Sequence, residues 1–432
     1  MPRVVLLVPS ATYRASDFME AAKSLGIEVV VASDHRSTLA PIMGDRALVI
    51  DPSRPEEAAA AIAELARRLP IDAAVGVDDT TVLAANLANA ALGRPHNPPE
   101  AVMATRDKLA LRAAWSAAGV PQPRWHPLDA GDCPADVGRA IGWPCVVKPA
   151  GLSASRGVIR ADGPSEVAAA ADRARSIIES SGGAHDQTLV IEEFVPGPEV
   201  AVEGLMRSGD LEILAIFDKP DPLDGPFFEE TIYVTPSRLE NSVQAELASV
   251  VARAARALGL VEGPVHAEAR LGTDAITGSG EAGVGVDQVA GPAGAGLPGS
   301  GIKMLELAAR SIGGLCSRTL SFGSGMSLEQ VILAHALGLA IESIEREESA
   351  AGVMMIPIPQ SGVLIGVDGR DEARAVPGVT GLEISVAPGR LVEPLPEGNR
   401  YLGFIFAKAH TTSGVEESLR RAHGLLEIKI QA

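Results

Sequence analysis

Two glutamates in separate alternating segments are the strongest candidates for chemistry in this sequence. In residues 265–271, VHAEARL, the alternation places Glu268 on the polar face of an expected strand. A second expected strand, residues 301–310, carries Glu306 and Arg310 on one face, before a Gly-Gly turn. If the two strands pair, the carboxylates oppose each other and repel unless they share a proton or a cation.

The cation that best fits this pair is Mg²⁺, held between the protein and the phosphates of a nucleotide. A solvated amphipathic hairpin explains the same two strands equally well. The rest of the chain has to distinguish a metal site from an ordinary hairpin.

Three upstream segments offer groups that could contact a nucleotide. Lys148 ends an apolar stretch and could reach a phosphate, although a surface lysine would look the same. The next loop, residues 151–158, offers N–H groups and hydroxyls to phosphate, but it has no Walker A pattern and could be an ordinary loop. Residues 189–198 form an expected strand and turn, where the backbone of residues 193–195 would meet an adenine edge. Glu199 would then accept hydrogen bonds from ribose, and an acidic strand end is the alternative.

The elements expected around these residues alternate between strands and helices. Residues 1–96 show the β-α-β rhythm of a small doubly wound domain, without a GxGxxG after the first strand. Residues 97–345 would form the domain with the candidate site, including a flexible Gly-rich insertion at 273–300 and a long helix at 328–344. Residues 346–432 would form a small α+β domain.

Composition narrows the class of protein. The length of 432 residues suggests about two to three domains, and the hydrophobic content of 46% is ample for their cores. Its net charge of −18 disfavours general binding to nucleic acid or anionic membranes. Three cysteines outside any Cys/His pattern fit a reducing compartment without structural zinc. No signal peptide and no membrane-spanning run is expected, so we expect a cytoplasmic location.

Taken in order, these motifs resemble the ATP-grasp superfamily over roughly residues 1–345. The order is a lysine-bearing helix, a strand ending in lysine, a Gly/Ser loop, IEEFVPGPE, an HxExR strand and an ExxxR strand followed by Gly-Gly. The resemblance implies an ATP-grasp fold, α/β and α+β, with a doubly wound pre-ATP-grasp domain in front and a small C-terminal α+β domain behind. It also implies ATP and Mg²⁺ as cofactors, with Mn²⁺ as a substitute, and it allows a homodimer.

The resemblance assigns roles to individual residues. It implies nucleotide-binding roles for Lys108, Lys148, Ser153, Ser155, Arg156, Gly157, Glu192, Glu193, Phe194, Val195 and Glu199. Glu268 and Glu306 match the Mg²⁺-binding pair, and Arg310 matches the arginine that steadies the transferring phosphoryl group and the acyl phosphate. Many relatives have Asn two residues after the second glutamate, where this chain has Ala308, which implies one fewer metal ligand.

Within the superfamily, ELAARSIGG and FDKPDPLDGPFFEETIYVTPSRL look most like the bacterial L-amino-acid ligases, as does the C-terminal region. Those enzymes join free amino acids, so the implied activity is ADP-forming carboxylate–amine ligation through an acyl phosphate. Glu230 is implied to contact the amino group of the first amino acid. Glu230, His266 and the substrate phosphate are all candidates for the general base. The alternatives are an ATP-grasp ligase of purine or other small-metabolite synthesis, and a catalytically silent nucleotide-binding protein.

Overall fold

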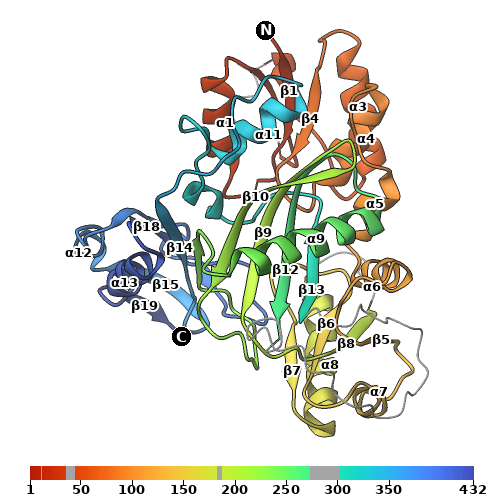
Figure 1. The fold of residues 1–432 in the computed structure, drawn as a ribbon, viewed down its shortest axis with the longest axis vertical. Helices are drawn as coiled ribbons and strands as arrows, with labels where there is room; N and C mark the ends of the chain where they lie inside the picture. Colours follow the sequence, from red (N-terminus) through yellow and green to blue (C-terminus); the bar gives the residue numbers. More distant parts are fainter. Residues whose placement is uncertain (11, 36–43, 182–186, 273–300) are drawn as a thin grey trace.

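The computed structural model describes residues 1–10, 12–35, 44–181, 187–272 and 301–432. Within them the chain forms a parallel N-terminal sheet, a small antiparallel sheet and a long sheet between the two (Figure 1). The expected flexible insertion at residues 273–300 lies outside the described residues.

The N-terminal sheet is parallel and has helices on both faces, as the β-α-β pattern predicts. Its spatial order is β3 (Ala47–Val49), β2 (Glu28–Ser33), β1 (Arg3–Leu7) and β4 (Ala73–Gly76). Helices α3 (Pro55–Ala66) and α4 (Val82–Ala91) pack on one face. The other face packs on α1 (Ala15–Ser24) and on α11 (Leu328–Ala336), which comes from much later in the chain.

The small antiparallel sheet follows two short helices, α5 (Pro99–Ala104) and α6 (Lys108–Ala117). Its spatial order is β5 (Trp125–Leu128), β8 (Leu189–Glu193), β6 (Cys145–Pro149) and β7 (Ile159–Ala161). Helices α7 (Pro134–Ile141) and α8 (Pro164–Ser180) pack on it through buried aliphatic side chains. This sheet therefore presents its other face to the rest of the molecule.

The long sheet has the spatial order β13 (Ile302–Ala308), β12 (Gly263–Leu271), β9 (Glu199–Arg207), β10 (Asp210–Lys219), β11 (Ile232–Thr235), β14 (Ala350–Ile356), β18 (Gly403–Ala409) and β16 (Val379–Ile384). Helix α9 (Asn241–Leu258) packs on β9, β12 and β13. The link between its halves is the antiparallel pairing of β11 with β14, where Ile232 lies opposite Met354. The expected boundary between residues 345 and 346 therefore falls between strands of one continuous sheet.

The remaining C-terminal elements form a separate layer. A fourth sheet has the order β17 (Leu391–Val392), β15 (Gly362–Asp368) and β19 (Glu427–Gln431). Helices α12 (Arg370–Arg374) and α13 (Thr412–His423) share a buried core with these strands and with β14 and β18.

Two expected elements are shorter than predicted. The helix expected over 328–344 ends at Ala336, because Gly338 turns with φ +64° and the Leu339 N–H returns to the Ala334 carbonyl (2.8 Å). The strand expected over 301–310 ends at Ala308. Arg310 therefore does not continue the alternation of Glu306 along a strand, and that part of the prediction is wrong.

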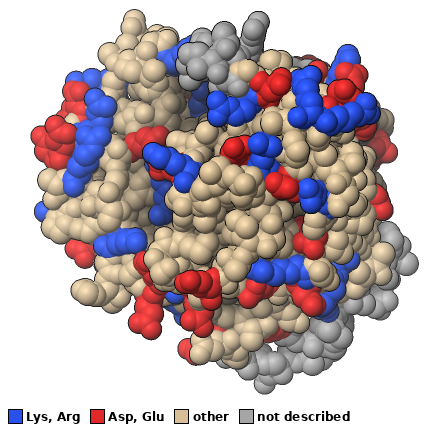
Figure 2. Space-filling view, turned by 90° about the horizontal axis from the view of Figure 1, so that it is seen from above, with Lys and Arg blue, Asp and Glu red and all other residues tan. Residues whose placement is uncertain are grey.

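The surface of the described residues carries both signs of charge. On the face seen in Figure 2, basic and acidic side chains are interspersed rather than gathered by sign. No helix among the described residues has the length and apolar content needed to cross a membrane.

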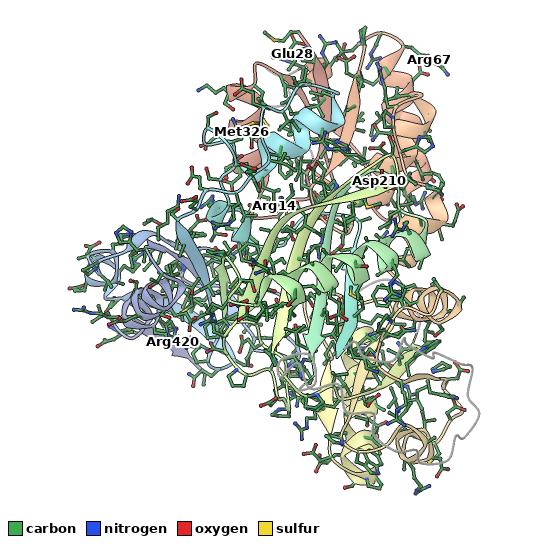
Figure 3. All side chains as sticks on the ribbon, viewed as in Figure 1. Arg14, Glu28, Arg67, Asp210, Met326 and Arg420 are labelled. Carbon is green, nitrogen blue, oxygen red and sulfur yellow. The ribbon has the colours of Figure 1, made fainter. Side chains whose placement is uncertain are left out.

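A buried arginine joins the N-terminal sheet to the rest of the chain. Arg14, labelled in Figure 3, is 3% exposed and lies before α1. Its guanidinium donates to Ser311 (2.9 Å) and pairs with Glu329 of α11 (3.2 Å). This contact fixes α11 on the N-terminal sheet and holds the segment after β13 close to it.

Candidate active site

The candidate site is a cavity of about 560 Å³ between β6 and β8 of the small sheet and β12 and β13 of the long sheet. Apolar side chains form much of its wall: Val146, Val158, Phe194, Val195, Leu223, Phe228 and Leu305. The charged groups in it are Lys148, Glu192, Glu193, Glu199, Glu230, Glu268, Arg270 and Glu306.

The expected pairing of the two glutamate strands is confirmed. β12 and β13 are antiparallel neighbours, and Glu268 lies directly opposite Glu306. A bulge follows, because Ala269 pairs with Met304 and leaves Leu305 without a partner in the ladder. Leu305 therefore lines the cavity beside Glu306, although strict alternation predicts that it points away.

One side of the cavity has an excess of positive charge. Glu192 of β8 is 1% exposed and is held by Arg112 of α6 (2.7 Å to Nε) and by Lys148 of β6 (2.9 Å). Burial alone would raise the pKa of Glu192, but Arg112 and Lys148 outweigh it and hold the pKa at about 2. Two cations around one carboxylate leave a net positive charge facing the cavity.

The opposite side has an excess of negative charge. Lys219, at the end of β10, is 3% exposed, and its Nζ contacts Glu199 (2.7 Å), Glu268 (3.0 Å) and Glu230. Burial and the neighbouring carboxylates raise the pKa of Glu230 to about 7 against the lowering effect of Lys219. Burial also opposes ionisation of Glu268, but Lys219 and His266 hold its pKa well below the usual range.

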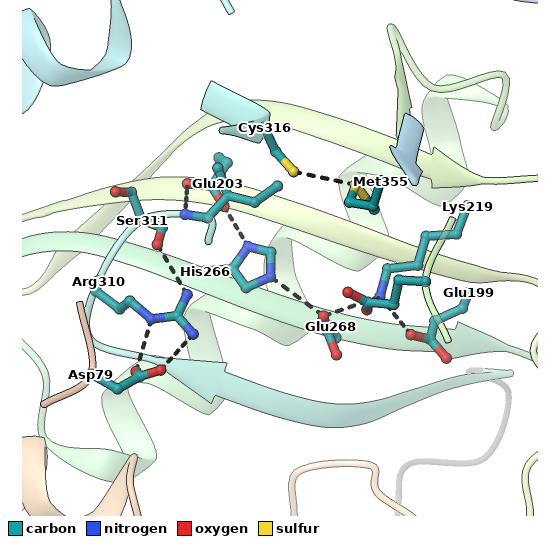
Figure 4. Close-up of polar contacts among 12 residues, drawn as sticks. Asp79, Glu199, Glu203, Lys219, His266, Glu268, Arg310, Ser311, Cys316 and Met355 are labelled. Atoms are coloured by element: carbon teal, nitrogen blue, oxygen red, sulfur yellow. Dashed lines mark hydrogen bonds and ion pairs between the residues drawn. The ribbon is translucent and has the colours of Figure 1, made fainter. Parts of the chain in front are cut away.

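A chain of polar contacts leads from this cluster toward Arg310 (Figure 4). His266 contacts Glu268 (3.4 Å from Nε2) and Glu203 through its other ring nitrogen. Burial would lower the pKa of His266, but Glu203 raises it to about 9. Glu203 also accepts a hydrogen bond from the Ile312 N–H (3.0 Å), just after Arg310.

Arg310 lies outside the cavity wall and is paired with the N-terminal domain. Its Nε and Nη2 donate to the two carboxylate oxygens of Asp79, both at 2.8 Å. The pair is only partly buried, with 18% of the Arg310 side chain and 28% of the Asp79 side chain exposed. A bidentate carboxylate contact of this kind is what a substrate carboxylate would also make with arginine.

The loop at residues 151–158 is fastened at both of its sides. The Lys108 ammonium donates to the Leu152 carbonyl (2.7 Å) and lies 3.4 Å from Glu306. On the other side, the Gly157 N–H donates to the Pro396 carbonyl (3.0 Å). Of the expected loop residues Ser155 lines the cavity, while Ser153, Arg156 and Gly157 do not.

The strand exit after β8 is only partly free to meet a base. The Phe194 N–H donates to the Pro144 carbonyl (3.2 Å), and the Val195 carbonyl accepts from Arg270 (2.7 Å), so these two backbone groups already have partners within the protein. The turn continues at Gly197, with φ +111°, where a Cβ would collide with the Leu271 carbonyl oxygen. Only glycine fits that approach of the turn to β12.

The structure brings most of the expected site residues to one cavity. Those lining it are Lys148, Ser155, Glu192, Glu193, Phe194, Val195, Glu199, Glu230, Glu268 and Glu306. Lys108 and His266 contact its lining residues from behind. Lys219 and Arg112 were not predicted as site residues, although Lys219 has the same signal as Lys148, a lysine at the end of an apolar strand.

The donor set fits the two groups implied for this fold. Glu268 and Glu306 offer the carboxylate oxygens that Mg²⁺ prefers, and ligand atoms of Glu199, Glu230 and Glu268 lie within 4.8 Å of one another. Apolar and aromatic walls beside Lys148 suit a base next to phosphates.

A cavity between two antiparallel sheets, with a parallel sheet in front of them, is the arrangement expected of an ATP-grasp protein. Three family models match the chain: ATP-grasp N-terminal domain over residues 19–96, ATP-grasp domain over 141–279, and L-amino acid ligase C-terminal domain 2 over 354–431. The chain belongs to the ATP-grasp superfamily and carries the C-terminal domain of the L-amino acid ligases.

Proteins of known sequence match different portions of the chain. An uncharacterized protein, y4rH, of Sinorhizobium fredii is 29% identical over 332 residues, which cover 75% of this chain and 61% of that protein. A D-alanine–D-alanine ligase of Aromatoleum aromaticum is 33% identical over 156 residues, 35% of this chain and 48% of the ligase. The chain thus matches less than two thirds of the length of either relative.

The similarity in three dimensions extends over the whole chain. The crystal structure of an L-amino acid ligase from Bacillus licheniformis matches 100% of this chain and 99% of its own, with a TM-score of 0.76 and 24% identity. The two proteins share their fold.

Proposed function

We propose that the protein is an ATP- and Mg²⁺-dependent ligase that forms an amide bond between two amino acids. The observation that carries the proposal is the division of one cavity into a cationic side, with Lys148, and an acidic side, with Glu268 and Glu306. That division suits a phosphate chain with its metal, and the similarity to ligases that act on amino acids supports the class of substrate.

In this proposal the nucleotide lies along the cavity. Its base packs between apolar side chains such as Phe194 and Leu305, its ribose meets Glu199, and its phosphates meet Lys148 and the loop at residues 151–158. Glu268 and Glu306 would hold Mg²⁺, which supplies charge neutralisation for phosphoryl transfer when bound.

The reaction then runs in two steps. A substrate carboxylate oxygen attacks the γ-phosphorus of ATP, the bond to the β-phosphate oxygen breaks, and ADP leaves with an acyl phosphate formed. The amine of the second amino acid attacks the acyl carbon, and inorganic phosphate leaves. Lys148 stabilises the charge on the phosphoryl oxygens. Arg310 would contact these oxygens and the acid substrate only after its guanidinium leaves Asp79.

Glu230 is our candidate for the contact with an amino group and for the general base. It lines the cavity, and its pKa of about 7, raised by burial and by Glu268 and Glu199 against Lys219, allows it to accept the amine proton. His266 suits that task less well, because Glu203 overcomes the effect of burial and raises its pKa to about 9.

The test is phosphate release from ATP and Mg²⁺ with single amino acids and with pairs. We expect release with at least one pair and a dipeptide in the product mixture, and no release above background with any acid or pair would contradict the proposal. In Glu306→Gln we expect a loss of about 100-fold in kcat. Glu212→Gln, an exposed change on β10, should keep full turnover.

A further inference from the structure

Lys219 has the environment of a buried metal ion rather than of an ordinary lysine. Its side chain is 3% exposed, and its ammonium contacts three carboxylates from three strands or loops: Glu199, Glu230 and Glu268. Its Nζ also lies 5.0 Å from the centre of the Tyr233 ring. A lysine that deeply buried is stabilised only by this concentration of negative charge.

The same three carboxylates form the group in the described residues whose ligand atoms converge closely enough for a metal ion, within 4.8 Å of one another. The ammonium therefore occupies the place where a divalent cation would find its oxygen ligands. An ammonium and a divalent cation cannot both occupy that space, because at about 3 Å in a poorly solvated site their repulsion is severe.

The other charges nearby do not replace Lys219. Arg270 pairs with Glu199 (2.9 Å), and His266 contacts Glu268 (3.4 Å). Among the described residues, Lys219 is the cation that contacts Glu230. Removal of the ammonium would thus leave Glu230 with no ion-pair partner in the cluster and the whole cluster short of positive charge.

We propose that Lys219 is an internal cation that keeps divalent metal out of the Glu199–Glu230–Glu268 cluster until an anionic ligand draws the ammonium away. The proposal rests on the proposed function, in which Glu268 binds Mg²⁺ and the anion is a nucleotide phosphate. Lys219 is then a positioning residue: it holds the carboxylates together before the metal arrives, and it makes metal loading depend on the nucleotide.

The experiment measures Mn²⁺ binding without nucleotide or amino acids, by paramagnetic resonance of free Mn²⁺. We expect no saturable site below millimolar concentration in the natural protein and one site per chain in Lys219→Met, at least tenfold tighter. Lys219→Arg keeps a cation and should behave as the natural protein does. Equal Mn²⁺ binding by the natural protein and a folded Lys219→Met variant would overturn the proposal.

A second variant controls for the possibility that Lys219→Met does not fold. Lys219→Met combined with Glu230→Gln removes one positive and one negative charge, so the balance of the cluster is kept and the new side-chain amide still offers a carbonyl oxygen to a metal. We expect Mn²⁺ binding at least threefold tighter than in the natural protein, and no gain in this folded double variant also contradicts the proposal. Because no turnover is measured, the result stands apart from whether amino acids are ligated.

Discussion

Two buried ion clusters face the same cavity. In one the cations outnumber the carboxylates, and in the other the carboxylates outnumber the cation. In one, the Glu192 carboxylate lies between Arg112 and Lys148, and these cations overcome burial to hold its pKa at about 2. In the other, the Lys219 ammonium lies among three carboxylates, and burial with the excess negative charge raises the pKa of Glu230 to about 7.

The difference shows how a site can be prepared for a ligand of each sign. A buried cluster with unequal charges is costly until a ligand of the opposite sign arrives. The cluster with the extra cation is suited to phosphate, and the cluster with extra carboxylates is suited to metal. Substitutions that remove one charge at a time test whether this imbalance of charge affects stability and ligand binding.

The largest effect is expected from removing Arg112, which is 1% exposed and makes two hydrogen bonds to Glu192. Arg112→Met keeps the apolar stem but leaves a buried carboxylate with Lys148 alone, so we expect a loss of about 3–5 kcal/mol in the free energy of unfolding, measured by denaturant titration. Arg139→Met, in an exposed pair with Asp136, is the control and should cost less than about 1 kcal/mol. Similar losses in both variants would mean that the Glu192 cluster does not stabilise the fold.

Acid should weaken the same cluster. The pKa of Glu192 is lower in the folded protein than in the unfolded chain, so its stabilising contribution is complete above about pH 4.5 and is lost as the pH falls toward about 2. The contribution is on the order of 3 kcal/mol. Denaturant titrations across this range should show the natural protein losing stability relative to Glu192→Gln, and parallel curves would argue against the low pKa.

Removing the second cation should affect the nucleotide more than the fold. Lys148→Met leaves Glu192 paired with Arg112, so the Glu192 cluster loses its excess positive charge. We expect ATP to bind about 30-fold more weakly, about 2 kcal/mol, in a direct binding titration. The control is Lys303→Met, which removes a lysine whose ammonium contacts the Gln122 carbonyl (3.3 Å). An equal loss of ATP affinity in this variant would show that the effect of Lys148→Met does not come from the cavity.

The smallest effect is expected at the ion pair of Arg310 with Asp79, in which one positive charge balances one negative charge. Asp79→Asn removes a carboxylate that competes with the acid substrate, so we expect the KM for that substrate to fall about fivefold, about 1 kcal/mol, while the KM for ATP is unchanged. Exposed Asp51→Asn is the control. A rise in the KM of the acid substrate would show instead that Asp79 positions Arg310.

Alternation and apolar runs predicted the strands that carry Lys148, Glu268 and Glu306, and even the pairing that sets the two glutamates opposite each other. These signals are local, because each depends only on neighbours within one strand. The Leu305 bulge was not predicted, since an extra residue in a ladder leaves no mark on the alternation of a short strand.

The partners of the charged groups could not be predicted in the same way. Asp79 and Arg310 are separated by 231 residues, and Arg112 and Glu192 by 80. Which carboxylate meets which cation depends on how sheets and helices pack, and a single sequence does not encode that pairing in any spacing.

Helix α8 was not predicted either, although its apolar residues recur at helical spacing and are buried against the small sheet.

The contact between the loop at residues 151–158 and Pro396 and Glu397 has a consequence for synthesis of the protein. Arg156 donates to the Glu397 carbonyl (3.2 Å) across 241 positions of sequence. On the ribosome the loop is made first, and the residues that fasten it appear only after most of the long sheet has been translated. A nascent chain therefore has the strands of both cavity walls before it has residues 396–397, which fasten the loop at residues 151–158.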